Sequence, residues 1–329
     1  MNPYALIDFH LHLDGSLSLA SVRELAAMQG IAVDAEDAAL LKRLQVNPGC
    51  RDLNEYLEKF AFPCSLLQTA GALTKCVANL RRELAQQGLL YAEIRFAPQF
   101  HLGQGLTQDQ VVEAAVAGLN GEGVKANLIL CCMRGVGNHE KNLETVRVAK
   151  KYLDKGVCAV DLAGAEALFP TADFAGEFAL AKELEIPYTI HAGEADGPES
   201  IRKALELGAQ RIGHGVRCIE DEALMAELAE KGIPLEMCPT SNIQTCIFEK
   251  ISDYPLARLL DAGIRATVNT DNMMVSGVTL SSEFDEMAKL LTADQLRRAV
   301  FNSVEAVFAD EETKAWLRRG VEARLGGAV

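Results

Sequence analysis

The sequence predicts an α/β protein, a (β/α)₈ TIM barrel with a helical insertion between strands 1 and 2 and extra C-terminal helices. Eight short β-rich runs alternate with longer amphipathic segments along the 329 residues. Several runs are almost continuously apolar, as expected for parallel strands that helices cover on the outside. No glycine-rich phosphate loop follows any run, which favours a closed barrel over a doubly wound sheet.

The predicted strands are short, and the segments between them carry helix-end signals. Thr107 and Thr292 each begin a capping-box pattern, with Gln three residues later. Pro198 fits the first position of a helix, and Gly208 fits the residue that ends the same helix. The eight predicted strands are Ala5–His12, Tyr91–Pro98, Lys125–Met133, Val157–Gly164, Pro187–Glu194, Arg211–Gly215, Pro234–Asn242 and Arg265–Asn272.

The first and second strands are separated by far more chain than one crossover helix needs. Four segments in this gap have helical patterns: Leu19–Gln29, Glu36–Gln45, Leu53–Phe60 and Leu66–Gln87. We expect residues 16–90 to be a helical insertion at the catalytic end, either a lid over the site or a purely structural subdomain. The stretch 280–325 is expected to be helical and to close the barrel. Because the sequence contains no recognisable linker or repeat, residues 1–329 are predicted to form one domain.

Composition narrows the classes of function. A formal net charge of −14 argues against binding nucleic acid or an anionic membrane and suits a neutral or cationic small molecule. No run of 18 apolar residues and no signal-peptide pattern occurs, which predicts no membrane segment. The nine cysteines are odd in number and include no Cys-x-x-Cys, so free thiols and a cytoplasmic location are expected. These features predict no particular oligomeric state.

Several predicted strands end in polar side chains, at the end of a barrel where functional residues gather. His10 and His12 are two apart in a strand and therefore share one face. His191 ends strand five and Asp271 ends strand eight. Three imidazoles and a carboxylate suit zinc and leave room for a water, whose pKa the metal lowers to about 7. Each histidine alone is well explained as a buried structural residue, but together they predict a metal centre.

Two further polar residues follow strand ends near the expected metal. Glu194, three residues past His191, is expected to project toward the metal without binding it and to exchange protons with a substrate. His214 ends strand six and is a candidate base or electrostatic partner for the attacking water. The other two histidines are left out of the site: His101 is expected at the mouth or in solvent, and His139 on the surface at a helix start.

The motifs at these strand ends, taken in order, resemble the adenosine deaminase family of the metal-dependent amidohydrolase superfamily. The resemblance extends from strand one to strand eight. The matching segments are His10-Leu11-His12-Leu13-Asp14-Gly15, Ala92-Glu93-Ile94-Arg95-Phe96-Ala97-Pro98, Asp161-Leu162-Ala163-Gly164, His191-Ala192-Gly193-Glu194, Arg211-Ile212-Gly213-His214-Gly215, Pro239-Thr240-Ser241-Asn242 and Asn269-Thr270-Asp271. The zinc motifs of cytidine-type deaminases are missing.

The resemblance implies a zinc-dependent hydrolytic deamination of adenosine and 2′-deoxyadenosine, in which hydroxide adds to C6 of the purine and ammonia leaves. Glu194 would protonate N1, His214 would orient or deprotonate the water, and Asp271 would accept its hydrogen bond. One zinc ion per chain would be held by the metal ligands His10, His12, His191 and Asp271.

The resemblance also implies substrate contacts, for which the expected residues are His12, Asp14, Gly164 and Asn272. The Gly164 N–H would donate to N3, and Asp14 would face the ribose 5′-hydroxyl, which favours a nucleoside over a free base. Asn272 stands where many relatives have a second Asp, and its amide can donate to N7 without being protonated. Leu57 and Phe60 resemble apolar lid residues of the family.

Two other functions stay open on the sequence. One is a deaminase of another 6-aminopurine, such as adenine or a 5′-modified or N6-modified adenosine. The other is a non-catalytic barrel that binds a purine or a partner protein; the acid beside a metal set speaks against it, since a pure binder needs no such acid.

Overall fold

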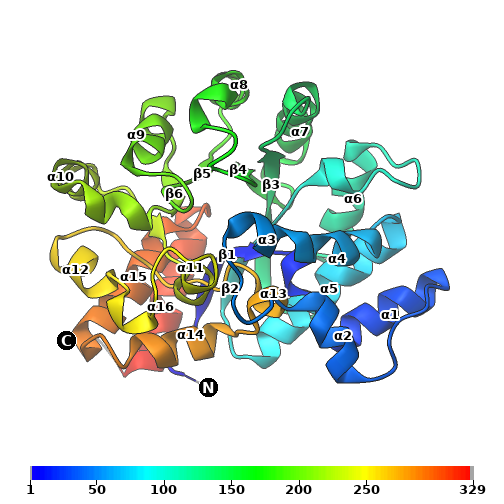
Figure 1. Cartoon of the computed structure of the whole chain (residues 1–329), viewed down its shortest axis with the longest axis horizontal. Helices are drawn as coiled ribbons and strands as arrows, with labels where there is room; N and C mark the ends of the chain where they lie inside the picture. Colours follow the sequence, from blue (N-terminus) through cyan, green and yellow to red (C-terminus); the bar gives the residue numbers. More distant parts are fainter. Residues whose placement is uncertain (1, 327–329) are drawn as a thin grey trace.

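Two parallel sheets form the barrel wall of the chain, whose computed structural model describes residues 2–326 (Figure 1). The first sheet has the order β1-β2-β3-β4 and the second has the order β5-β6-β7. Single bridges join the sheets, one of them between Val160 and Tyr188. The strands are β1 (Ile7–His12), β2 (Tyr91–Phe96), β3 (Lys125–Met133), β4 (Val157–Ala163), β5 (Thr189–Ala192), β6 (Arg211–His214) and β7 (Leu235–Glu236). The barrel predicted from the sequence is confirmed.

The seventh strand is much shorter than the prediction of Pro234–Asn242. Strand β7 ends at Glu236, and the helix α11 (Pro239–Gln244) begins three residues later. Pro239 lacks a backbone N–H and has a fixed φ, so it fits the first position of a helix better than the interior of a sheet. The prediction was therefore wrong for the second half of this run.

The eighth predicted strand, Arg265–Asn272, is extended but is not a regular strand. It is bridged to β7 on one side and to β1 on the other. On the β1 side the Asp271 N–H donates to the His10 carbonyl at 2.8 Å, and the Asp271 carbonyl accepts from the His12 N–H at 2.7 Å. Asp271 has a φ of +60°, which interrupts the extended backbone at this point. The segment still closes the barrel where the eighth strand was expected.

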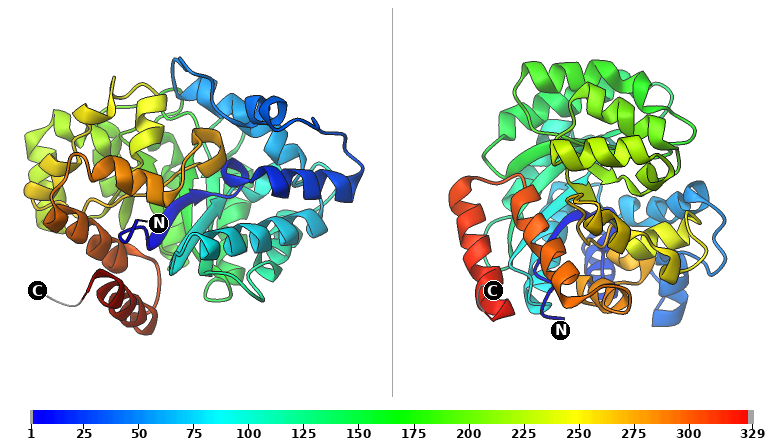
Figure 2. Two further views of the ribbon diagram at one scale, coloured as in Figure 1. Left: turned by 90° about the horizontal axis from the view of Figure 1, so that it is seen from below. Right: turned by 90° about the vertical axis from the view of Figure 1, so that its left-hand side faces the viewer.

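Helices cover the outside of the strands, and short 3₁₀ helices connect many of the elements (Figures 1 and 2). Capping boxes begin α6 at Thr107 and α15 at Thr292, as predicted. The covering helices are α6 (Gln108–Ala117), α7 (His139–Tyr152), α8 (Ala175–Glu183), α9 (Pro198–Leu207), α10 (Glu222–Lys231) and α12 (Leu256–Asp261). The 3₁₀ helices are η1 (Asp14–Ser16), η2 (Glu58–Phe60), η3 (Pro98–Phe100), η4 (Thr171–Phe174), η5 (Val216–Glu220) and η6 (Ile251–Asp253).

The segment between β1 and β2 is helical, as expected. Its last and longest helix, α5, packs against α6 and therefore takes the place of the covering helix between the first two strands. Figure 1 shows the other helices of this segment beside and above the strand ends. The helices are α1 (Leu19–Gln29), α2 (Asp37–Leu44), α3 (Leu53–Leu57), α4 (Ala61–Ser65) and α5 (Ala70–Gln86). Only part of residues 16–90 thus lies over the barrel.

The C-terminal part packs helices against the first strand, and α15 contacts both β1 and α16. These helices are α13 (Met273–Ser276), α14 (Leu280–Met287), α15 (Ala293–Ala306) and α16 (Glu311–Leu325). Across residues 2–326, no helix is long and apolar enough to cross a bilayer. All nine cysteines are free, as expected from their number and spacing.

A buried carboxyl between α14 and α11 makes the stability of the fold depend on pH. The Glu283 side chain is 1% exposed and accepts the Thr240 N–H at 3.2 Å, and burial raises its pKa from 4.5 to about 8. A carboxyl whose pKa is raised by folding favours the folded state below its unfolded pKa and loses that contribution as the pH rises. This part of the stability is therefore lost between pH 4.5 and about 8.

We predict that Glu283→Gln flattens this part of the pH dependence, because the amide still accepts from Thr240 and does not ionise. Urea unfolding at pH 5, 6, 7 and 8 measures it, as the difference between variant and parent. Glu222→Gln is the matched control, since the Glu222 side chain is 80% exposed. A parent and a Glu283→Gln variant that lose stability equally over this range would contradict the prediction.

Candidate metal centre and active site

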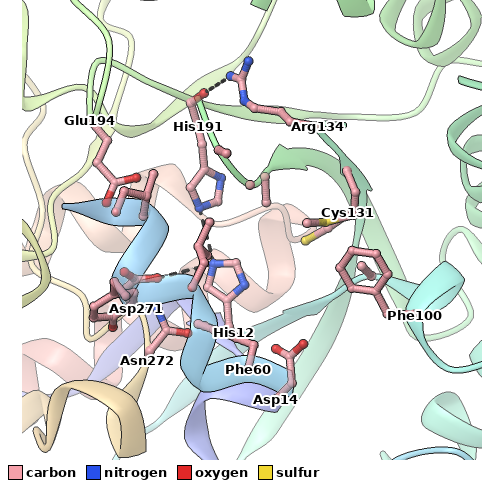
Figure 3. Close-up of a pocket in the computed structure, with 18 of the residues that line it drawn as sticks. His12, Asp14, Phe60, Phe100, Cys131, Arg134, His191, Glu194, Asp271 and Asn272 are labelled. Atoms are coloured by element: carbon pink, nitrogen blue, oxygen red, sulfur yellow. Dashed lines mark hydrogen bonds and ion pairs between the residues drawn. The ribbon is translucent and has the colours of Figure 1, made fainter. Parts of the chain in front are cut away.

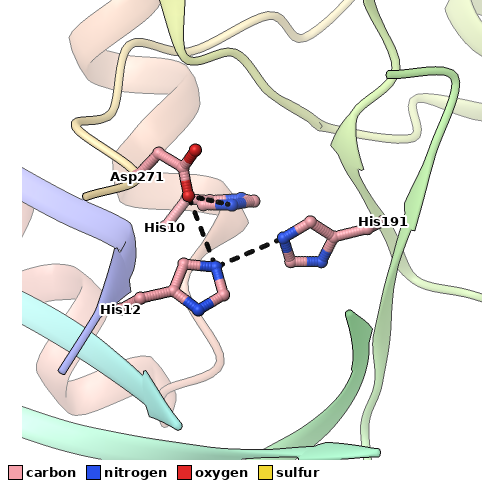
Figure 4. Close-up of side chains that lie close together, drawn as sticks. All are labelled: His10, His12, His191 and Asp271. Atoms are coloured by element: carbon pink, nitrogen blue, oxygen red, sulfur yellow. Dashed lines mark hydrogen bonds and ion pairs between the residues drawn. The ribbon is translucent and has the colours of Figure 1, made fainter. Parts of the chain in front are cut away.

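Four donor side chains converge at the C-terminal ends of the strands (Figure 4). One ligand atom from each lies within 4.8 Å of the others, and the four residues are His10, His12, His191 and Asp271. The His12 and His191 Nε2 atoms are 3.3 Å apart, and Asp271 Oδ1 lies 3.5 Å from His10 Nε2 and 3.4 Å from His12 Nε2. Three imidazole nitrogens and one carboxylate oxygen form a donor set that suits a divalent metal.

Buried carboxylates fix the orientation of two of these imidazoles. The His10 Nδ1–H donates to Glu236 at 2.7 Å, and the His191 Nδ1–H donates to Asp161 at 2.9 Å. Each Nε2 is therefore left with its lone pair facing the cluster. His10 Nε2 is buried and has no hydrogen-bond partner. An orphaned acceptor of this kind, beside two more nitrogens and a carboxylate, is what a metal cation would satisfy.

One arginine joins the two supporting carboxylates. The Arg95 guanidinium, 0% exposed, donates to Asp161 at 2.9 Å and to Glu236 at 2.7 Å. Burial raises the pKa of Glu236, but the charges of Arg95 and Arg211 hold it well below its usual value. Both supporting carboxylates are therefore ionised and accept the imidazole N–H bonds. Glu236 and Arg95 were not among the site residues predicted from the sequence, although charged residues in an apolar strand are a signal of buried pairing.

Backbone strain lies at two of the site residues. His214 has a φ of +57° and Asp271 a φ of +60°, a region that side chains other than glycine rarely adopt. Each such residue costs on the order of 1–3 kcal/mol and persists where the surroundings hold it. Here the turn at each strand end directs the side chain toward the cluster, and Ser241 Oγ further holds Asp271 Oδ2 at 2.6 Å.

A cavity of about 290 Å³ opens beside the cluster. In Figure 3, Glu194, Asp271 and Asn272 lie along one side of this cavity, and Asp14 and Phe100 lie along the other. Apolar side chains of the insertion line it as well, among them Leu57 and Phe60. The cavity therefore places polar groups around a mainly apolar space, the usual character of a small-molecule site.

Glu194 and His214 face each other inside the cavity. Glu194 Oε2 lies 3.6 Å from His214 Nε2, and both side chains are buried. Burial, followed by the Asp271 and Glu166 carboxylates, raises the pKa of Glu194 well above its usual value. Burial lowers the pKa of His214 well below its usual value. Burial therefore favours the protonated carboxyl of Glu194 and the neutral imidazole of His214.

The hydrogen-bond network also determines the tautomer of His214. The Tyr254 hydroxyl donates to the Asn242 Oδ1 at 2.9 Å, so the Asn242 Nδ2–H₂ points to His214 Nδ1 at 3.1 Å. An amide donor at Nδ1 requires the imidazole proton to be on Nε2. His214 therefore presents an N–H, not a lone pair, toward Glu194. Asn242 belongs to the motif Pro239-Thr240-Ser241-Asn242, but its role beside His214 was not predicted from the sequence.

The expected substrate contacts line the same cavity. The Asp14 Oδ2 accepts the Cys64 S–H at 3.3 Å, while Oδ1 is buried without a partner. Gly164 has a φ of +107°, a conformation that a side chain would strain. Asn272 Oδ1 also lacks a partner, and a Cβ on Gly15 would lie 2.0 Å from it. The unsatisfied Asp14 Oδ1 is therefore an acceptor left for a ligand.

The two histidines left out of the site lie away from the cluster, but the expectation for one was wrong. His101 is 0% exposed, and neither ring nitrogen has a hydrogen-bond partner, so it neither lines the mouth nor meets solvent. Burial lowers its pKa to about 4. His139 begins α7 with a side chain that is 57% exposed, as expected, and Nδ1 lies 3.1 Å from Glu177.

Comparison with known proteins finds relatives that match nearly the whole chain. Residues 5–324 match the family described as adenosine deaminase. An adenosine deaminase from Haemophilus ducreyi is 48% identical over 98% of this chain and 96% of its own length. One from Enterococcus faecalis is 37% identical over 96% of this chain and 95% of its own. The solved adenine deaminase of Arthrobacter aurescens has a TM-score of 0.87 and 27% identity, and the match covers 99% of both chains.

The carboxylates behind the histidines generate a prediction about metal affinity. Asp161→Asn removes the charge that holds the His191 Nδ1–H, so the variant should bind a divalent metal about 10–100-fold more weakly. Competition with a chromophoric chelator measures the affinity. Asp294→Asn is the matched control, since the Asp294 side chain is 77% exposed. Equal affinities for parent and Asp161→Asn would show that this carboxylate does not support the metal.

Proposed function

The chain belongs to the adenosine deaminase family, and we propose that it hydrolyses adenosine and 2′-deoxyadenosine to inosine and deoxyinosine with release of ammonia. The observation that carries the proposal is Glu194, a buried carboxyl 3.6 Å from His214 and beside a set of metal-donor side chains. Its raised pKa favours the protonated form, which can act as an acid inside the cavity. A site that only binds a purine has no use for such an acid.

One zinc ion is the proposed cofactor, because three imidazoles and a carboxylate match its ligand preference. The proposed ligands are His10, His12, His191 and Asp271, and the buried His10 Nε2 without a partner supports this assignment. When bound, zinc lowers the pKa of water to about 7 and supplies a nucleophile at neutral pH.

Glu194 is the proposed general acid. Its carboxyl proton passes to N1 of the purine, which draws electron density from C6 and makes that carbon a better electrophile. The product keeps a proton on N1. In the net reaction one proton of the water replaces the proton that Glu194 gave, and the other leaves with ammonia. The protein therefore regains its own protonation state after each turnover.

His214 is proposed to orient the attacking water as a donor. Its Nδ1 accepts from Asn242, so its Nε2–H is free to donate to the oxygen that approaches C6. This favours orientation over deprotonation among the two roles that the sequence left open. Asp271 accepts a hydrogen bond from the same water, with its carboxylate held by Ser241. Both side chains are rigid because their partners are buried.

The remaining contacts orient the nucleoside. We propose that His12 borders the reacting face, that the Gly164 N–H donates to N3, and that the Asn272 amide donates to N7. The Asp14 Oδ1, buried without a partner, is proposed to accept the ribose 5′-hydroxyl. A single acceptor oxygen suits a hydroxyl better than a phosphate, whose charge it would repel.

The insertion is proposed to act as a lid over the purine within one barrel domain. Leu57 and Phe60 line the cavity from this segment. The Tyr56 hydroxyl is buried and lies 2.7 Å from Ser276 Oγ, so this contact joins α3 to α13. A cytoplasmic location is proposed from the nine free thiols, since a reducing compartment keeps them so.

The central test is ammonia release from a panel of 6-aminopurines by the metal-loaded protein. We expect adenosine and 2′-deoxyadenosine to react, and adenine and adenosine 5′-monophosphate to react far more slowly. Glu194→Gln should lose about 10²–10⁴-fold in kcat and keep its metal, because an amide cannot donate the acid proton. Bound adenosine without ammonia release by the parent would refute the proposed activity. A fully active Glu194→Gln variant would refute the assigned acid.

The assignment of Asp14 gives a second test. Asp14→Ala should lower kcat/KM for adenosine by about 10-fold or more, because a buried hydroxyl loses a charged acceptor worth about 1.5–3 kcal/mol. With 5′-deoxyadenosine, which lacks that hydroxyl, the same substitution should change kcat/KM little. Equal losses on both substrates would place Asp14 elsewhere than at the 5′-hydroxyl.

A further inference from the structure

Glu166, in the loop between β4 and η4, is a buried acid that the mechanism above does not use. It is 1% exposed. No basic side chain lies within 4.0 Å of its carboxylate anywhere in residues 2–326. A buried carboxylate without a salt bridge needs several hydrogen-bond donors to stay in the folded protein.

The donors are the backbone amides of the loop that carries the proposed acid. Four consecutive N–H groups, those of residues 193–196, converge on this one carboxylate. Gly193 donates to Oε1 at 2.7 Å, and Glu194, Ala195 and Asp196 donate to Oε2 at 3.0, 2.8 and 3.0 Å. The Ser200 hydroxyl, in the first turn of α9, donates to Oε1 at 2.5 Å. The carboxylate thus replaces solvent as the acceptor for the whole turn.

The local sequence makes this convergence possible. Gly193 has a φ of +73°, and a Cβ there would lie 2.3 Å from Ile201 Cδ1, so only glycine fits the turn. Such a residue turns successive amides to one side and forms an anion-binding nest. Pro198 begins α9 directly after the nest, and the positive end of that helix adds a favourable field for Glu166.

The same contacts tie the two edges of the cavity together. Glu166 lies two residues after Gly164, the proposed N3 donor, and its carboxylate holds the backbone of Glu194, the proposed N1 acid. The loop after β4 and the loop after β5 are thereby fixed at one distance before any substrate arrives. Fixed spacing matters because a misplacement of about 1 Å can cost on the order of 10²-fold in rate.

We infer that Glu166 is the positioning residue for the acid: its carboxylate holds the amides of residues 193–196 so that Glu194 meets N1 while Gly164 meets N3. This inference rests on the proposed deaminase activity. Glu166 itself touches neither the substrate nor the metal ligands, and it acts only through Glu194.

The substitution Glu166→Gln tests the inference with little change in volume. A Gln side chain has one acceptor oxygen and turns an NH₂ group toward backbone N–H donors, so part of the nest loses its acceptor. We expect kcat for adenosine to fall by about 10²-fold with KM changed far less, since the contact to N1 counts mainly in the transition state. Metal content should equal that of the parent. Glu166→Asp, which keeps the charge but has a shorter reach, should recover part of kcat.

A double-mutant cycle separates positioning from a general structural role. In a Glu194→Gln background, adding Glu166→Gln should cause no further loss of kcat, because the group that it positions is already gone. Equal losses in both backgrounds would overturn the inference. Glu199→Gln is the matched control: its side chain is 89% exposed, so it removes the same charge nearby without touching the loop.

The outcomes distinguish this inference from the activity it rests on. A parent protein that releases no ammonia from adenosine refutes the proposed function. An active parent with a fully active Glu166→Gln variant refutes only the positioning role. If the glutamine variant fails to bind metal, the Glu166→Asp variant is carried through the same cycle, and its loss must again vanish in the Glu194→Gln background.

Discussion

The buried guanidinium of Arg95 is the interaction on which the rest of the site depends. It lies in β2 and bonds at once to Glu236 in β7 and Asp161 in β4, and each of those carboxylates orients one histidine of the cluster. One side chain in the barrel interior therefore sets the direction of His10 and His191, which come from opposite parts of the wall. The geometry of the cluster is a property of the barrel core rather than of its loops.

The acids and bases behind the cluster form a network that is costly to bury. Arg211 continues it with ion pairs to Glu236 at 2.7 Å and to Glu93 at 2.6 Å, and both acids are 0% exposed. Buried pairs of this kind add little net stability, because desolvation offsets much of their attraction. Their contribution is orientation: the arginines hold Glu236 and Asp161 in place, so these carboxylates keep their bonds to His10 and His191. The network therefore adds little to the free energy of folding, but it makes the site rigid before a ligand binds.

Much of this fold could be predicted from the sequence because hydrophobic periodicity and helix-end signals depend on neighbouring residues only. The side chains of His10-x-His12 share a face by strand geometry alone, and the barrel followed from eight runs separated by helices. The extended segment 265–272 was overestimated as a strand, because the positive φ of Asp271 belongs to the site and not to the local pattern. Glu236 and Glu166 escaped notice for another reason. Glu236 binds His10, which lies 226 residues away in the sequence, and Glu166 binds backbone amides. Neither kind of partner produces a pattern in the neighbouring sequence.

The seam between the two sheets has a consequence for assembly. His10 and His12 belong to the first sheet, whereas His191 belongs to the second and Asp271 to the segment that closes the ring. A chain with only one sheet formed offers at most half of the proposed donors, so the proposed metal site needs both sheets and the closing segment. If the proposed site binds a metal, mass action then favours the closed barrel over partly folded forms of the chain. A metal bound at the proposed site would thus stabilise the completed barrel relative to partly folded chains, which would remain free to refold.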